Sequence, residues 1–208
     1  MSNREQAELA LTYVRSLRIC SSIPRLSGPW SLFERRHILS NREQARHHAI
    51  QSDPSRSRLS DAVRAARQTP TVVPNEDVRL ARLELQRLQR REQMIFTCNY
   101  FSHLARLARR DRVGNCAEQA AIAYFHLSAR GTLQVALIGF VSGLDDHAVA
   151  VVGLEPNVEI SNGIIVTDRS EWGSDPWICD PTEHAVYRPI DLDEGHPPRL
   201  ICYSPGPQ

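Results

Sequence analysis

The sequence predicts an α+β fold in which a helical N-terminal part packs with an antiparallel β-sheet. Apolar residues recur at helical spacing up to about residue 130, and short runs rich in Val and Ile follow. Helices followed by successive strands are typical of antiparallel α+β domains. The chain has 208 residues, of which 41% are hydrophobic and 24% are charged. These values suit one ordinary domain with some additional sequence.

Four segments are predicted to be helical. Segments 3–19 and 59–67 carry Ala, Leu, Val and Arg at near-helical spacing. Segment 76–110 is more strongly periodic, with a break expected at 97–99. Segment 116–129 is rich in Ala and follows a polar turn. The helical part is therefore expected to end near residue 129.

Five short strands are predicted after the last helix. They are rich in Val and Ile and are separated by polar loops, one of which contains Asp145 and Asp146 as loop carboxylates. They cover residues 133–141, 147–154, 164–167, 177–179 and 200–203.

A domain boundary is expected near residue 75. Residues 1–75 are rich in Arg and Ser and are interrupted by breaks that contain Pro24, Pro29 and Pro54. They are interpreted as a leader that is partly disordered, or as a helical subdomain that packs on the rest. Residues 76–208 are interpreted as the domain that carries the chemistry.

Charge and hydropathy exclude several classes of partner. The formal net charge is only +1, which argues against a nucleic-acid binder with a large basic surface. The most apolar stretches, 135–141 and 148–154, are too short to span a bilayer. The N-terminus is polar where a Sec-type signal peptide would lead into an apolar run. No nucleic-acid partner and no membrane span are therefore expected.

All 25 basic residues are arginine, so the chain contains no lysine. A GC-rich genome explains this bias as well as selection does. Selection would act because lysine, and not arginine, is the acceptor of ubiquitin. The missing lysines therefore favour a bacterial protein that is delivered into a eukaryotic host.

The five cysteines indicate reduced thiols. Their number is odd, their spacing is irregular and no CxxC pair occurs, so neither a disulfide framework nor a zinc ribbon is expected. They are Cys20, Cys98, Cys116, Cys179 and Cys202.

Three short motifs carry the chemistry. In Gly-Asn-Cys, Cys116 stands where a tight turn enters a helix, and the N–H groups and the positive dipole end of a helix stabilise a thiolate. His147 opens an apolar strand, and Asp180 ends a short strand. A cysteine nucleophile needs a base within hydrogen-bond reach, and the base needs a third group that orients it. The order Cys, His, Asp therefore predicts a catalytic triad.

Other residues compete for these roles. Asp175 is an alternative orienter of the histidine, and His184 could join the three triad candidates in a zinc site, although no ligand pair has finger-like spacing. Trp172 and Trp177 either wall the cleft or pack in the core. Glu118, in the first helical turn, complements the helix dipole and needs no catalytic role.

The motifs GNC, DHAVAVV and WICDP resemble the papain-fold toxin and effector family, which includes type III effector glutamine deamidases. The resemblance covers about residues 95–203 and implies a papain-like or transglutaminase-like core. It implies Cys116 as nucleophile, His147 as general base and acid, and Asp180 as orienter. The stretch 108–113 lacks the Gln that papain-like proteases use in the oxyanion hole, so the backbone N–H of Cys116 is the one oxyanion donor the sequence indicates.

The predicted function is thiol acyl transfer on a host protein side chain, with glutamine deamidation favoured by the resemblance. A cysteine protease, a transglutaminase and a non-catalytic protein-binding module on the same fold are the alternatives. The chemistry needs no metal and no nucleotide cofactor. The resemblance and the missing lysines further imply secretion by a non-Sec route, action in the host cytoplasm, and a leader that carries a secretion signal and binds a secretion chaperone.

Overall fold

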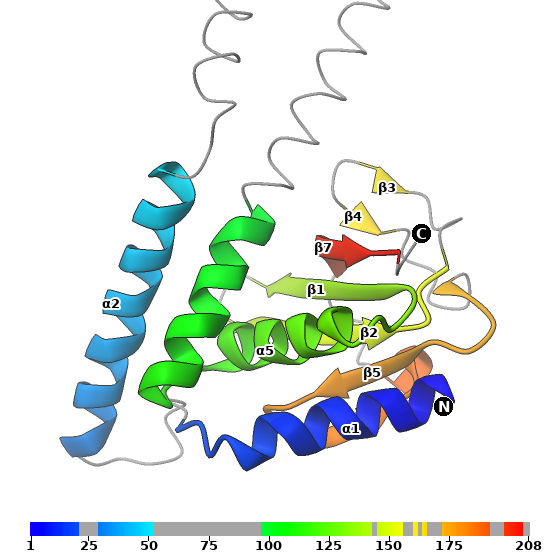
Figure 1. The fold of residues 1–208 in the computed structure, drawn as a ribbon, viewed down its shortest axis with the longest axis horizontal. Helices are drawn as coiled ribbons and strands as arrows, with labels where there is room; N and C mark the ends of the chain where they lie inside the picture. The colour runs from blue at the N-terminus through cyan, green and yellow to red at the C-terminus, as the bar shows by residue number, and fades with distance from the viewer. Residues whose placement is uncertain are drawn as a thin grey trace, which may run out of the picture.

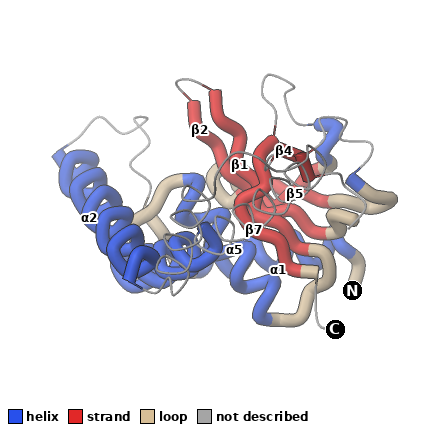
Figure 2. The backbone as a smooth tube through the Cα atoms, turned by 90° about the horizontal axis from the view of Figure 1, so that it is seen from above, coloured by secondary structure: helices blue, strands red, loops and turns tan. Residues whose placement is uncertain are grey.

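A computed structural model describes residues 1–20, 29–51, 97–142, 145–155, 160–161, 164–165, 172–191 and 198–205. Helices lie on one side of a central sheet (Figures 1 and 2). The helices are α1 (Asn3–Ser16), α2 (Pro29–Gln51), an unlabelled helix over 97–111, and α5 (Cys116–Ala129), with a short 3-10 helix at Pro189–Asp191. The strands are β1 (Val135–Ser142), β2 (Asp145–Val152), β3 (Ile160–Ser161), β4 (Ile164–Ile165), β5 (Trp177–Asp180), β6 (Ala185–Tyr187) and β7 (Pro198–Ser204).

The sheet within these residues has seven strands in the order β3-β4-β7-β1-β2-β5-β6. Every pair of neighbouring strands is antiparallel. The β1–β2 hairpin forms its centre and places Phe140 opposite His147. Helices beside an antiparallel sheet make this an α+β fold, as the sequence predicts.

The two faces of the sheet bury two different sets of side chains, because successive residues of a strand point to opposite faces. On β1, Val135 and Leu137 join the cluster that includes α1 and α5, whereas Ala136 and Ile138 join a second cluster. Trp172 fills that second cluster and is fully buried. Both faces of the central hairpin are therefore buried, which explains why its strands are continuously apolar instead of alternating with polar residues.

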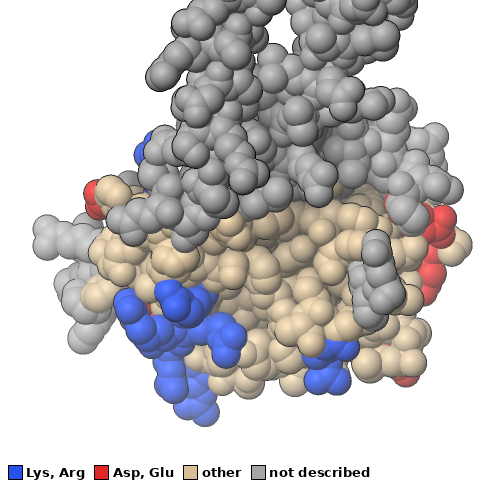
Figure 3. Space-filling model, turned by 45° about the horizontal axis from the view of Figure 1, so that its top comes forward, with Lys and Arg blue, Asp and Glu red and all other residues tan. Residues whose placement is uncertain are grey.

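Helix α5 lies across β1 and β2, and α1 lies beside α5 and β5 (Figure 1). The small residues of α5, among them Ala120, Ala121 and Ala123, are fully buried and allow the helix to approach the sheet closely. Helix α1 begins with a capping box, in which Ser2 and Glu5 satisfy each other's backbone N–H groups. On the face drawn in Figure 3, Arg side chains form separate groups between uncharged surface, which fits the small net charge.

Most predicted elements are present, with shifted ends. The helix predicted over 116–129 is found with those bounds, and the helix predicted over 3–19 is present as α1. The break expected at 97–99 is wrong, because residues 97–111 are helical without interruption. Segment 59–67, the predicted boundary near residue 75, and residues 76–96 lie outside the described residues.

The strand predictions need two corrections. Asp145 and Asp146 belong to β2 and not to a loop, because the β1–β2 ladder extends to the pair Ser142 and Asp145. Strands β3 and β6 were not predicted, since they have only two and three residues. None of the helices in the described part of the chain is both long enough and apolar enough to cross a bilayer.

Gly153 provides a test of this packing, because it has a φ of +81° at the end of β2. A Cβ there would collide with Nδ2 of Asn3 and would lie 2.8 Å from the carbonyl oxygen of Asp175. Those two groups are themselves hydrogen-bonded at 2.8 Å, and they tie α1 to the residues before β5. Gly153→Ala therefore adds a steric clash to the backbone strain of a left-handed residue.

Gly131, which follows α5, has a φ of +74° and is exposed, so Gly131→Ala serves as the strain-only control. We expect Gly131→Ala to lower the free energy of unfolding by about 1–2 kcal/mol. Gly153→Ala should cost a further 1–3 kcal/mol, roughly, because of the clash. Urea unfolding of the full chain measures both. Equal losses would contradict the tight packing of α1 against this turn.

Candidate active site

The turn that presents Cys116 is built around the buried side chain of Glu118. Oε2 of Glu118 accepts the N–H of Asn115 at 3.0 Å, which caps the start of α5. Nε2 of Gln119 donates to the carbonyl oxygen of Gly114 at 3.0 Å. A Cβ on Gly114 would lie 2.6 Å from Cβ of Glu118, so the close approach of backbone and side chain requires glycine. These contacts explain the Gly-Asn-Cys motif.

The N-terminal segment also holds this turn. The N–H of Cys20 donates to the carbonyl oxygen of Arg112 at 2.8 Å, and the N–H of Gly114 donates to the carbonyl oxygen of Cys20 at 2.9 Å. The two segments form a parallel bridge between Cys20 and Val113. The residues after α1 therefore fix the chain immediately before Cys116.

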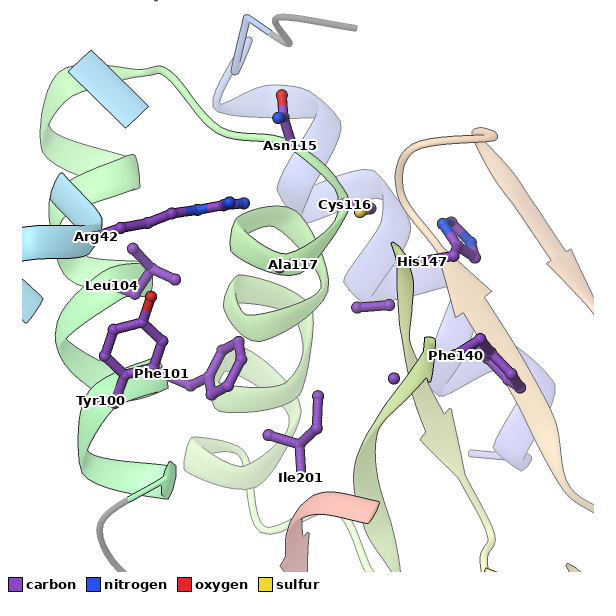
Figure 4. A pocket seen from close by; sticks show the side chains of 12 residues that line it. Arg42, Tyr100, Phe101, Leu104, Asn115, Cys116, Ala117, Phe140, His147 and Ile201 are labelled. Atoms are coloured by element: carbon purple, nitrogen blue, oxygen red, sulfur yellow. The ribbon is translucent and has the colours of Figure 1, made fainter. Parts of the chain in front are cut away.

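The structure brings the three predicted triad residues together. Nε2–H of His147, on β2, donates to Oδ2 of Asp180 at 2.6 Å. The side chain of His147 lines the same pocket as Cys116, which stands at the start of α5 (Figure 4), and the interaction with Cys116 helps to raise the pKa of the imidazole. Strands β2 and β5 are neighbours in the sheet, and this places the carboxylate beside the imidazole. The arrangement can support a thiolate–imidazolium pair oriented by a carboxylate.

Asp180 is held as a carboxylate although only 1% of its side chain is exposed. Its Oδ1 accepts the backbone N–H groups of Thr182 and Glu183, both at 3.1 Å. Its Oδ2 accepts the hydroxyl of Tyr187 at 3.1 Å besides the bond from His147. Burial opposes ionisation, but the bond and the charge of His147, with the other donors, outweigh it and lower the pKa of Asp180.

The same contacts raise the pKa of His147 to about 10. The hydrogen bond to Asp180 is the largest cause and the bond to Cys116 comes second, while burial acts in the opposite direction. His147 is therefore an imidazolium at neutral pH. Because this pKa lies above the ordinary value of 6.5, the stabilisation of the fold is complete below about pH 6.5 and is lost as the pH rises through about 10.

A pocket of about 480 Å³ adjoins Cys116 and His147 (Figure 4). Its apolar lining comes mainly from the helix over 97–111, from β1 and β2, and from one residue of β7. Polar groups lie near the start of α5. The lining residues are Arg42, Tyr100, Phe101, Leu104, Asn115, Cys116, Ala117, Gly139, Phe140, His147, Ala148 and Ile201. An apolar cavity with a few convergent polar groups is typical of a substrate site.

Arg42 is the pocket residue that the sequence analysis missed. It comes from α2, and its Nε and Nη2 donate to Oε1 and Oε2 of Glu118 at 2.6 and 3.2 Å. Only 1% of the Glu118 side chain is exposed in this forked ion pair, whereas 40% of the Arg42 side chain remains exposed. The sequence holds no local signal for it, because 76 residues separate the partners. Glu118 does lie in the first turn of α5 as predicted, but it also pairs with α2.

The competing assignments are not supported by the geometry. Oδ1 of Asp175 accepts Nε1–H of Trp177 at 2.9 Å and pairs with Arg188 at 3.0 Å, whereas Asp180 is the carboxylate on His147. Trp172 packs in the core on the sheet face opposite α5. Trp177 is half-buried and stacks with Arg188, whose guanidinium carbon lies 4.6 Å from the ring centroid.

The remaining site predictions concern metal and oxyanion binding. His184 is exposed in the turn after β5, and the described residues contain no group of three or more His, Cys, Asp or Glu side chains placed to hold a metal. Cys116 is the first residue of α5, so its N–H belongs to the N-terminal turn that can stabilise an oxyanion. That role stays a prediction.

Comparison of the chain with models of known protein families, with curated proteins and with solved structures finds no match in any of the three. The assignment of a function therefore depends on the geometry of the site and on the sequence motifs.

The charge on His147 can be measured directly by NMR titration of its ring. We expect the ring to stay protonated until about pH 10, and Asp180→Asn to lower this pKa more than Cys116→Ala does, because the bond to Asp180 is the larger cause. His103 is an internal reference of opposite sign, since burial and nearby cations lower its pKa. Equal effects of the two substitutions would contradict the dominance of Asp180.

Proposed function

We propose that this chain is a cysteine-dependent acyl-transfer enzyme that deamidates glutamine side chains of a protein substrate. The observation that carries the proposal is the position of His147, which is hydrogen-bonded to the buried Asp180 and lines the same pocket as Cys116. An imidazolium beside a thiol favours a thiolate nucleophile, and a carboxylate that fixes the ring completes the set of groups that thiol acyl transfer requires.

The proposed reaction has two steps. The Cys116 thiolate attacks the carboxamide carbon of glutamine and forms a C–S bond, and the N–H groups at the start of α5 stabilise the oxyanion. The C–N bond then breaks, and His147 gives its proton to the departing ammonia. In the second step His147 takes a proton from water, which attacks the thioester. The C–S bond breaks, the product is glutamate, and the thiolate–imidazolium pair returns.

Deamidation is preferred to peptide cleavage and to cross-linking because of the resemblance of the three motifs to effector deamidases. A papain-like or transglutaminase-like core belongs to the same proposal, with a host protein as substrate. The absence of lysine and the resemblance support secretion by a non-Sec route and action in the host cytoplasm. A secretion chaperone would bind within residues 1–75.

The first test is the rate of iodoacetamide alkylation against pH, mapped at each cysteine by peptide mass spectrometry. We expect Cys116 to react well below the ordinary thiol midpoint of about 8.5. His147→Ala should slow alkylation of Cys116 at pH 7 at least tenfold, roughly, because an ordinary thiol is only a few per cent thiolate there. Exposed Cys20 serves as the reference thiol in the same sample. A Cys116 profile that matches Cys20 in both proteins would favour the binding-module alternative.

The second test identifies the reaction. Glutamine-containing peptides are incubated with the protein, and ammonia release and peptide masses are followed. We expect conversion of glutamine to glutamate, and a loss of activity on the order of a thousandfold or more in Cys116→Ala, because this substitution removes the proposed nucleophile. Cys20→Ala is the matched control. Cleaved peptides without ammonia release would instead identify a protease, and ammonia release that requires an added amine would identify a transglutaminase.

A further inference from the structure

Glu118 places a buried carboxylate at the backbone N–H of Asn115, the residue before the candidate nucleophile. It follows Cys116 by two residues in the first turn of α5, and its carboxylate is almost completely buried. The side chain also has a structural role, because its Oε2 accepts the N–H of Asn115 and so caps α5. A buried carboxylate in the same helical turn as a cysteine works against a thiolate there, since like charges in a poorly solvated site repel. Glu118 therefore stabilises the turn before Cys116, but its negative charge disfavours the Cys116 thiolate.

Arg42 offsets this charge from another part of the chain. Its guanidinium holds the Glu118 carboxylate with two bonds, at 2.6 and 3.2 Å, and the same side chain lines the pocket beside Cys116 (Figure 4). The bond to Glu118 is the largest cause that raises the pKa of Arg42, and the charge of Cys116 adds to it. Arg42 thus holds a cation against Glu118 in the pocket that Cys116 also lines.

The groups around Cys116 come from each element packed against it. His147 on β2 supplies the second cation, with Asp180 of β5 behind it. Tyr100, on the helix over 97–111, has its pKa raised by burial, so it is neutral at the pH of the reaction. Of the two buried carboxylates in these elements, Asp180 is paired with His147. The negative charge of the other, Glu118, is paired with Arg42.

We infer that Arg42 is a positioning residue of the candidate active site, which neutralises Glu118 so that this carboxylate can cap α5 without suppressing the Cys116 thiolate. The inference rests on the proposed thiol chemistry. It makes α2, which lies far outside the stretch that carries the effector resemblance, a working part of the site. Arg42 acts through Glu118 and forms no bond with substrate in this role.

The test compares four variants of the full chain by the pH dependence of Cys116 alkylation. Arg42→Met removes the cation at similar length, and we expect the midpoint to rise by about one unit, which is roughly tenfold slower alkylation at lower pH. Arg42→Lys keeps the charge and should shift the midpoint by less than half as much. Glu118→Gln combined with Arg42→Met should restore most of the parent profile, because both charges are then absent. Arg46→Met is the matched control on an exposed arginine one turn further along α2.

Each outcome is decisive. If Arg42→Met leaves the profile unchanged while His147→Ala shifts it, the inference is overturned and the proposed function stands. If the parent protein shows no enhanced reactivity at low pH, the proposed function itself fails. If the alkylation midpoint rises in Arg42→Met and stays raised when Glu118→Gln is added, Arg42 does not act by neutralising Glu118, and the inference is overturned. A raised KM for a peptide substrate with an unchanged alkylation profile would make Arg42 a substrate-binding residue instead.

Should Arg42→Met fail to fold, a fifth variant, Glu118→Gln alone, decides the question, because removal of only the anion should lower the midpoint of Cys116 alkylation below that of the parent, and an unchanged midpoint would overturn the inference. Arg42→Met leaves a buried carboxylate without its partner, whereas Glu118→Gln leaves none at this position. Circular dichroism and thermal unfolding establish which variants are folded at the temperature of the assay. A double variant that is folded but keeps a raised midpoint would contradict the inference in the same way.

Discussion

The architecture of the site follows from one constraint: a carboxylate removed from water must be compensated by donors or by positive charge. Two carboxylates among the residues that the structure describes are nearly inaccessible. Asp180 gathers donors from the turn after β5, from Tyr187 and from His147. Glu118 gathers the backbone of Asn115 and the guanidinium of Arg42. The partner of Asp180 is His147 and the partner of Glu118 is Arg42, and both partners line the pocket. The hydrogen bonds that stabilise the buried carboxylates therefore also position the side chains of the site.

The three triad candidates could be picked out because each has a local sequence signal, and the structure places them near one another. A polar turn before an Ala-rich helix marks Cys116, and His147 and Asp180 stand beside apolar strands. Arg42 could not be predicted, because a contact across 76 residues leaves no periodicity in the sequence. The pairing of Cys20 with the residues around Val113 is hidden for the same reason.

The errors in the fold prediction also have physical causes. The segment 97–99 looked like a helix break because Thr and Asn favour turns. Cys98 nevertheless packs against the core, and its Sγ donates to the carbonyl oxygen of Ile201 at 3.8 Å, so tertiary contacts keep this turn helical. Strands β3 and β6 are too short to show an alternating pattern, and their pairing with longer neighbours defines them.

The contact between Asn3 and Asp175 joins residues 172 positions apart, which bears on the order in which the chain folds. The β1–β2 hairpin can form as soon as its own residues leave the ribosome, because its contacts are local. Helix α1 precedes both of its partners, α5 and β5, in the chain, so its contacts with them can form only after those later elements have been made. The pocket has the same requirement, because residues from α2 to β7 line it. Its lining is complete only once β7 has joined β1 in the sheet and Ile201 is in place.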